Sequence, residues 1–268
     1  MARPFRFLPV LLMFGILGFG CHAGAQQTSE ESRAPAAAAA SGAADSGDAQ
    51  VARLLKQRGA KLYLDPDGRV QGIEAVESRL SDDDLAQLAG LKRLLWLEIG
   101  DGSITDAGLE HLKPLTRLER LYLHDLPLTD AGVANLAGLS SLEALSLKNT
   151  RITGKALAHL AGLAKLQALN LANTRVDDDG LAHLAGLGQL ETLCVEKTKV
   201  TGEGLAHLKG LSRLRVLNLK DCKVGDEHLD YLLPLRALKM LYLKGTKVTE
   251  PRAQKFKKRM EGLAVYFH

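Results

Sequence analysis

Four histidines hold one position of a repeating pattern, which is the kind of arrangement that could bind a metal ion. They are His111, His159, His183 and His207, and each is followed by a leucine. An imidazole column needs further acid or thiolate ligands at close range to complete a metal site. The pattern supplies none, and we expect these positions on outer helices that spread apart. The sequence therefore predicts partly exposed histidines beside core leucines, with no metal and no cofactor.

Three cysteines could offer a thiol for nucleophilic or redox chemistry: Cys21, Cys194 and Cys222. We expect Cys194 to point outward from a strand and Cys222 to lie in a turn four residues beyond the neighbour of Cys194 in the next repeat. At about 3.3 Å per strand residue, the two would be too far apart for a disulfide. The sequence therefore predicts that Cys194 and Cys222 are free thiols, and it pairs no general base with either of them.

Carboxylates recur at the starts of expected helices, most densely at Asp177-Asp178-Asp179. Acidic groups there complement the helix dipole, and neighbouring repeats lack the run that a calcium site would need. The repeat explains every candidate for a paired-carboxylate, Ser–His–Asp or phosphate-loop arrangement. We therefore expect that the protein is not an enzyme.

A 24-residue unit positions all of these groups. Its clearest copy, LSSLEALSLKNTRITGKALAHLAG, runs from Leu139 to Gly162, and the next copy follows from Leu163 without a gap. The Leu-x-Leu spacing predicts a short strand, and the later leucines share one face of a short helix. We expect Thr153 to cap that helix and Gly162 to end it in a left-handed conformation.

The pattern L-x-x-L-x-L-x-x-T-x-[IV]-T, continued as TDAGL in 105–109, resembles the leucine-rich repeat signature. The continuation is similar to that of the bacterial, cysteine-containing branch of this family. The resemblance extends over roughly 190 residues. It implies an α/β fold, a right-handed solenoid shaped as a horseshoe arc, with parallel strands on the concave face and short helices on the convex face.

Counting in steps of one repeat divides the chain into five parts. Expected are a signal peptide at 1–20, a disordered tether at 21–47, an N-terminal cap at 48–66, eight repeats at 67–258 and a C-terminal cap at 250–268 that overlaps the last repeat. Caps of this kind hide the ends of a solenoid's core. The apolar piece at 263–267 reads as a strand within the second cap.

The segment 1–20 has a basic start and an apolar run that indicate export. Two cleavage sites compete: one before Cys21, which would be lipidated as in a bacterial lipoprotein, and one after Ala25. The first predicts a membrane-anchored protein of the cell envelope, and the second a periplasmic or secreted one. The sequence leaves open which membrane would hold the chain.

Composition bears on the partner. Two arginines leave with residues 1–20, so the formal charge falls from +4 to about +2, which does not suggest nucleic acid. Lysines at 255, 257 and 258 could contact anionic lipid, although a solvated cap helix explains them more simply.

Residues between the strand leucines should form the concave surface. Large aromatic and basic side chains gather at its two ends, and Trp, Tyr and Arg often dominate binding energies. Trp96 could equally cover the N-terminal edge, stacked on Arg120. The expected partner-binding residues are Trp96, Glu98, Arg120, Tyr122, His124, Lys148, Asn170, Asn218, Lys220, Met240, Tyr242 and Lys244.

Two classes of function follow. The first is a non-enzymatic module of the cell envelope that grips a protein or peptide on the concave face. The second is an architectural spacer or self-associating scaffold. Neither the partner's identity nor the oligomeric state can be deduced from the residues.

Overall fold

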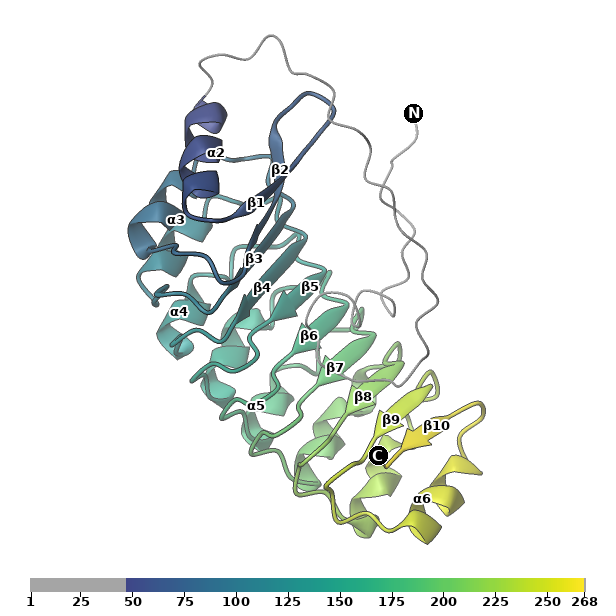
Figure 1. The fold of residues 1–268 in the computed structure, drawn as a ribbon. Helices are drawn as coiled ribbons and strands as arrows, with labels where there is room; N and C mark the ends of the chain where they lie inside the picture. Colours follow the sequence, from purple (N-terminus) through teal and green to yellow (C-terminus); the bar gives the residue numbers. More distant parts are fainter. Residues whose placement is uncertain (1–46, 268) are drawn as a thin grey trace.

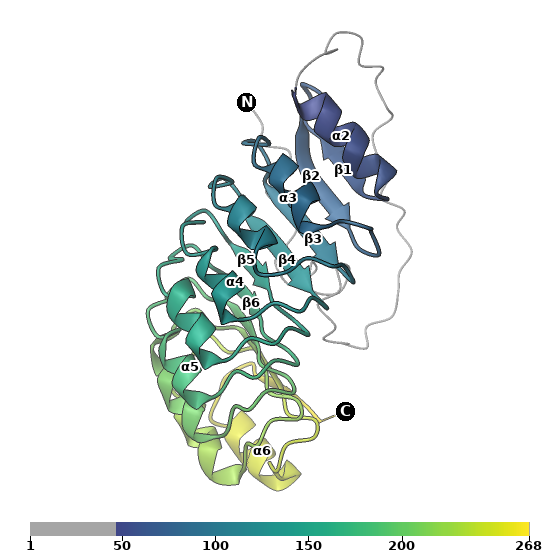
Figure 2. The same cartoon turned by 90° about the vertical axis from the view of Figure 1, so that its left-hand side faces the viewer.

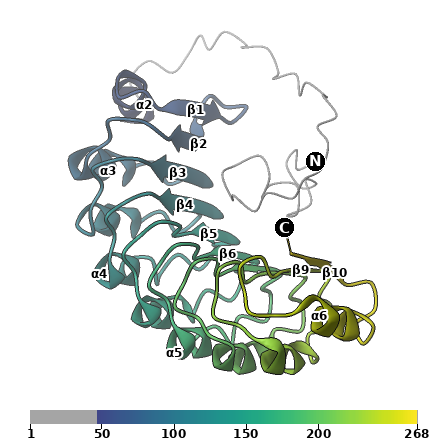
Figure 3. The same cartoon turned by 60° about the horizontal axis from the view of Figure 1, so that its bottom comes forward.

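The computed structural model describes residues 47–267. Within them the chain winds into an arc whose inner side is one continuous sheet and whose outer side carries the helices (Figures 1 and 3). The helices form a single layer when the arc is seen from outside (Figure 2). The expected signal peptide, the Cys21 and Ala25 cleavage sites and all of the tether except Gly47 lie outside the described residues.

The described part of the sheet has ten strands in sequence order. Strands β2 to β10 run parallel, one from each successive turn of the solenoid, and β1 pairs antiparallel with β2. The strands are β1 Lys61–Leu64, β2 Val70–Ala75, β3 Trp96–Gly100, β4 Arg120–His124, β5 Ala144–Ser146, β6 Ala168–Asn170, β7 Thr192–Cys194, β8 Val216–Asn218, β9 Met240–Tyr242 and β10 Ala264–Tyr266.

The outer elements are short, and four of them are 3-10 helices rather than α-helices. A repeat that also holds a strand and two loops leaves room for only about one or two helical turns. The helices are α2 Gly47–Gln57, α3 Asp82–Leu88, η1 Gly108–Leu112, α4 Asp130–Ala134, η2 Gly154–Leu160, α5 Asp178–Ala182, η3 Glu203–Gly210, η4 Asp226–Leu232 and α6 Glu250–Lys257. No helix in this described part is long and apolar enough to span a membrane.

One ribbon of leucine fills the space between sheet and helices. In the repeat from Leu139, Leu142, Leu145, Leu147, Leu157 and Leu160 are all fully buried. Their equivalents in the other repeats belong to the same cluster, which runs unbroken from Leu55 to Leu263. Each unit thus buries its apolar side against its neighbours, as the repeat pattern predicts.

The two ends of the core are closed by elements outside the regular repeats. Helix α2 packs its Leu55 into the first end. At the other end, α6 contributes Phe256, and β10 continues the register with Ala264 opposite Met240. The strand expected at 263–267 is therefore present as β10, the last strand of the described sheet.

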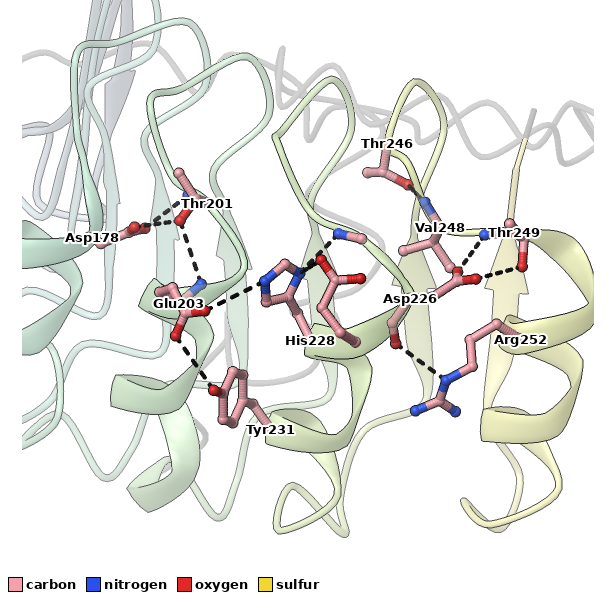
Figure 4. Close-up of polar contacts among 12 residues, drawn as sticks. Asp178, Thr201, Glu203, Asp226, His228, Tyr231, Thr246, Val248, Thr249 and Arg252 are labelled. Carbon is pink, nitrogen blue, oxygen red and sulfur yellow. Dashed lines mark hydrogen bonds and ion pairs between the residues drawn. The ribbon is translucent and has the colours of Figure 1, made fainter.

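The threonines and aspartates of the motif join successive repeats. The Thr153 amide and hydroxyl donate to the two carboxylate oxygens of Asp130 at 2.7 and 2.6 Å. The same pair of bonds links Asp82 to Thr105, Asp106 to Thr129, Asp178 to Thr201 and Asp226 to Thr249, the last two shown in Figure 4. Thr153 also caps η2 by accepting from the Lys155 amide, which confirms its expected role.

The glycine of the motif makes room for this carboxylate. A Cβ on Gly132 would clash with Oδ1 of Asp106, and Gly108 and Gly204 stand equally close to Asp82 and Asp178. The motif T-D-x-G is therefore a contact between repeats. Its threonine donates to the preceding unit, its aspartate accepts from the following one, and its glycine keeps the space between them.

The expected left-handed ending at Gly162 is wrong, because η2 ends at Leu160, its C-cap Ala161 is right-handed, and Gly162 does not have a positive φ. Positive φ occurs instead one to three residues after the strand ends, once per repeat, at Glu77, Asp101, Asp125, Asn149, Asn173, Lys197, Asp221 and Gly245. The sharp bend is needed where the strand turns into the edge loop. Asn and Asp tolerate the left-handed region better than most residues, which fits their frequency in this column.

Candidate functional site

The predicted concave columns lie on the sheet face opposite the leucine core. Tyr122, Cys194 and Tyr242 are buried, yet they do not belong to the core cluster that holds Leu121, Leu193 and Leu241. The register places Trp96 beside Arg120 and Glu98 beside Tyr122, as the repeat count requires. The columns are therefore real ladders across neighbouring strands.

Burial divides the twelve expected partner-binding residues into two groups. Partly or fully exposed are Trp96, Arg120, His124, Lys148, Met240 and Lys244. Buried are Glu98, Tyr122, Asn170, Asn218, Lys220 and Tyr242. Five of the six buried residues share one column across the strands, and Lys220 lies in the next column. The exposed residues alone can therefore contact a partner without a rearrangement of this face.

Trp96 is held against the N-terminal cap. Its ring lies over Gly72, where a Cβ would be 2.7 Å from the indole, and its edge meets the Tyr63 ring at 4.9 Å between centroids. The ring partner is thus Tyr63, not the expected Arg120. The indole Nε1 is buried and has no hydrogen-bond partner in the structure. Leaving a donor buried without a hydrogen-bond partner costs roughly 1–3 kcal/mol.

His124 is fixed between two carboxylates next to Trp96. Its Nε2 lies 3.3 Å from Glu98 and its Nδ1 lies 2.9 Å from Asp125. The ring folds back over Gly100, where a Cβ would clash with its Cε1. The hydrogen bond to Glu98 raises the pKa of His124 against the opposing effect of burial, with a further contribution from Asp125.

The neighbouring groups fix the charge state of this end. Burial raises the pKa of Tyr122 to about 12, so its phenol stays neutral. Burial opposes ionisation of Asp125, but hydrogen bonds from Asn149 and His124 outweigh it and lower the Asp125 pKa. The N-terminal end therefore combines an aromatic ring, a guanidinium and an imidazole whose pKa is raised.

The C-terminal end is aromatic and basic. The Lys220 ammonium lies 5.2 Å from the centre of the Tyr242 ring, within cation–π range. Tyr242 stacks on Tyr266 of β10 with centroids 4.7 Å apart. Met240, Lys244 and Tyr266 are the more exposed members of this group.

The centre of the face is polar. An open hollow of about 320 Å³ lies at the ends of β5 to β7, lined by Lys148, Asn149, Asn170, Ala172, Asn173, Cys194, Glu196 and Lys197. Beside it, the Asn218 amide donates to Glu196 at 3.0 Å. Small side chains and amides here leave space between the two aromatic ends.

The other sequence candidates are dispersed. His159, His183 and His207 are exposed on the helices, and His111 is half-buried. Within the described residues no group of three or more His, Cys, Asp and Glu side chains is arranged to hold a metal ion. Cys194 and Cys222 are buried thiols and form no disulfide, and the Cys222 thiol donates to the Val195 carbonyl at 3.0 Å.

One cluster was missed from the sequence. His228 occupies space left by Gly202 and lies 3.6 Å from Glu203 and 3.3 Å from Glu227, while Tyr231 donates to Glu203 (Figure 4). Its Nδ1 accepts from the Gly225 amide at 3.0 Å. The signal was two breaks in the motif, a Gly where Asp is usual and a Gly where Thr is usual, at Gly202 and Gly225.

A family model described as "Leucine rich repeat" matches residues 116–176. Among solved structures, internalin C2 from Listeria monocytogenes aligns with a TM-score of 0.64 and 27% identity over 82% of this chain and 93% of its own. The chain folds as a leucine-rich repeat solenoid. The plant peptide hormone receptor RGFR1, in complex with RGF2, has a TM-score of 0.51 and 18% identity over 77% of this chain and 36% of its own, which is a likeness of fold alone. No curated protein sequence gives a match.

Proposed function

We propose that this leucine-rich repeat solenoid is a non-catalytic binding module of the bacterial cell envelope that grips an extended protein or peptide segment along its concave face. The observation that carries the proposal is the pair of unlike ends on a face that the leucine core does not use. One end offers Trp96, Arg120 and His124, and the other offers Met240, Lys244 and Tyr266.

The N-terminal end is the expected anchor. Trp96 is pre-positioned by Gly72 and Tyr63, so little side-chain freedom is lost when a partner binds. The partly exposed Trp96 ring offers an apolar contact to a partner, and Arg120 in the adjacent strand offers a charged donor. Aromatic and arginine side chains are the types that most often supply large shares of binding energy.

Placement in the cell envelope rests on the export signal and on Cys21, which we propose is lipidated. The likeness to an internalin and to a receptor solved with its peptide is compatible with a protein or peptide partner. An extended segment suits the face because its length is spread over many strands, with anchors far apart and a polar hollow between them.

The test compares crosslinked partners of the full-length protein in its native envelope. The double variant Trp96→Ala, Arg120→Ala should lose a partner that the wild type captures, while its melting temperature stays within a few degrees. A matched variant, Lys92→Ala and Arg117→Ala, changes two exposed residues on loops before the strands and should retain that partner. Equal capture by all three proteins would refute a concave anchor at this end.

A self-associating scaffold is the alternative, and the outer strand β1 favours it. Tyr63 and Leu64 are 46% and 52% exposed on this strand, whose outer edge is unpaired within the described sheet. Exposed edges of this kind recruit other strands. Sedimentation at several concentrations decides the matter: a mass that rises with concentration and returns to the monomer in Leu64→Lys supports the scaffold.

A further inference from the structure

Two lysines on the concave face stand outside the ion pairs of residues 47–267. Lys148 and Lys244 lie two residues beyond the ends of β5 and β9, and Lys148 is half-exposed while Lys244 is exposed. Between them, Lys220 holds its ammonium over the Tyr242 ring. The face from β5 to β9 therefore presents cations that no ion pair neutralises.

The carboxylates in the strand columns of the same face already have partners. Glu74 accepts from the Lys61 ammonium at 2.7 Å and from the Tyr63 hydroxyl at 2.8 Å. Glu98 is 4% exposed and lies 3.3 Å from the His124 ring. These two acids are therefore not free to meet a basic partner.

Glu196, the remaining carboxylate in these columns of the described strands, accepts from the Asn218 amide at 3.0 Å. The side chains of the face that keep an unpaired charge are therefore positive. Carboxylates on a partner would complement them, whereas a basic partner would bring like charges together at a cost in binding free energy. The charge of the face itself thus favours an acidic ligand.

The rim of the face is acidic at one end and basic at the other. Four rim acids beside β2 to β5 stand outside every ion pair of the described residues: Glu77, Asp101, Glu119 and Glu143. Farther along, Glu191 pairs with Arg215, and Asp221 lies 3.9 Å from Lys197. Residues 211–267 hold thirteen Lys and Arg against six Asp and Glu. The positive balance is therefore strongest over the last strands.

This uneven charge distinguishes among anionic polymers. A nucleic acid, or a polysaccharide with an acid on each sugar, is charged along its whole length, so along the arc it would face the free rim acids as well as the lysines. A polypeptide can place carboxylates over the last strands alone and uncharged side chains elsewhere. The face also offers Trp96, Met240 and Tyr266 to the apolar side chains that a polypeptide carries.

We infer that the concave face binds an acidic segment of a polypeptide, whose carboxylates lie over β5 to β9 against Lys148 and Lys244. Apolar side chains of the same segment contact Trp96 and Met240. This inference rests on the proposed binding of an extended segment at this face and adds the chemistry of that segment. Long lysine side chains adapt to their partners, so the face selects the sign and the place of the charges rather than their interval.

The experiment selects random peptides, displayed on phage, that bind the immobilised full-length protein. From β3 to β9 the sheet spans roughly 29 Å at about 4.8 Å between strands, so peptides of about 16 residues are long enough. Face-dependent clones are those that the variant Trp96→Ala, Arg120→Ala no longer captures. Their sequences should contain Asp and Glu at roughly twice the frequency of the unselected library or more.

Synthetic peptides from these clones then test the two lysines. The variant Lys148→Gln, Lys244→Gln should bind them about 3–10-fold more weakly than the wild type, and with a weaker dependence on salt. The control Lys155→Gln, Lys209→Gln changes two exposed lysines on the outer helices η2 and η3. Its affinity should stay within about twofold of the wild type, because surface charges on the far side of the arc are screened.

Four outcomes would overturn the inference. Face-dependent clones without enrichment in Asp and Glu would do so while leaving the proposed function intact. Equal loss of affinity in the lysine variant and its control would mean a response to net charge alone. Tighter binding of oligodeoxythymidine than of any selected peptide, lost in the lysine variant, would assign the cations to nucleic acid. A selection without any face-dependent clone would count against the proposed function as well.

Discussion

Replacing Asp130 with Ala tests whether the aspartate–threonine contacts hold the repeats together. Asp130 accepts two bonds from Thr153 in the next repeat, at 2.7 and 2.6 Å. Bonds to a charged acceptor contribute about 1.5–3 kcal/mol each when buried. Both residues are half-buried here, so water replaces part of what is lost. We expect the free energy of unfolding to fall by about 2 kcal/mol in total.

Asp179→Ala is the matched control. Asp179 also stands in the first turn of a short helix, α5, and has the same charge, but it is exposed and outside the hydrogen bonds and ion pairs of the described residues. Its interaction with the helix dipole is about 0.3–1 kcal/mol, which Asp130 shares. The difference between the two variants therefore isolates the contact with Thr153.

Urea unfolding followed by circular dichroism gives the measurement. At an m-value of roughly 2–3 kcal/mol/M, the loss corresponds to a midpoint about 0.7–1 M lower. Hydrogen exchange should show that the Thr153 amide loses protection before those of the flanking repeats. If Asp130→Ala and Asp179→Ala unfold within about 0.5 kcal/mol of each other, the bonds add nothing to the interface and the reasoning is refuted.

Two further predictions concern the core and the candidate site. Leu169→Ala removes a fully buried side chain from the middle of the leucine core and should lower the free energy of unfolding by roughly 2–5 kcal/mol. Hydrogen exchange should rise first in the adjacent repeats, and unchanged exchange there would contradict a shared core. The hydrogen bond to Glu98 raises the folded-state pKa of His124 above its unfolded value, which is near 6.5. The protonated His124 therefore stabilises the folded protein fully below the unfolded pKa, and this stabilisation is lost as the pH rises through the folded pKa. Titration of the His124 ring signal by NMR should show the raised pKa, and Glu98→Gln should lower it; a His124 pKa that ignores this change would assign the shift to Asp125 instead.

The architecture could be predicted because one period determines it. The repeated spacing of Leu142, Leu145 and Leu147 gives the strand, its register and the buried face at once, and β10 keeps the same count at Ala264. The helix cap at Thr153 followed from local chemistry. By contrast, the left-handed bend fell at Asn149 rather than Gly162, because the edge loop turns more sharply than the helix end.

The candidate site was predictable in position but not in exposure. Alternation along a strand shows which side chains leave the core, and it placed Trp96 and Tyr122 on the same face. Alternation cannot show that the Tyr122 side chain is 2% exposed while the Trp96 side chain stays partly exposed. Nor does it show that Gly72 and Gly100 are the spaces into which Trp96 and His124 fold, because those contacts join residues from different repeats.

Breaks in the repeat carry the most specific information about this molecule. Where the usual Asp is replaced by Gly154, the next repeat has Asp177 in place of the usual Thr; where it is replaced by Gly202, the next has Gly225. The hydroxyl donor and the carboxylate acceptor are thus lost together, while the backbone amide at the threonine position remains. At the second break the space is taken by His228, which bonds to the Gly225 amide. Repeats in this solenoid are therefore matched in neighbouring pairs, and a substitution in the motif is best judged together with its partner in the adjacent repeat.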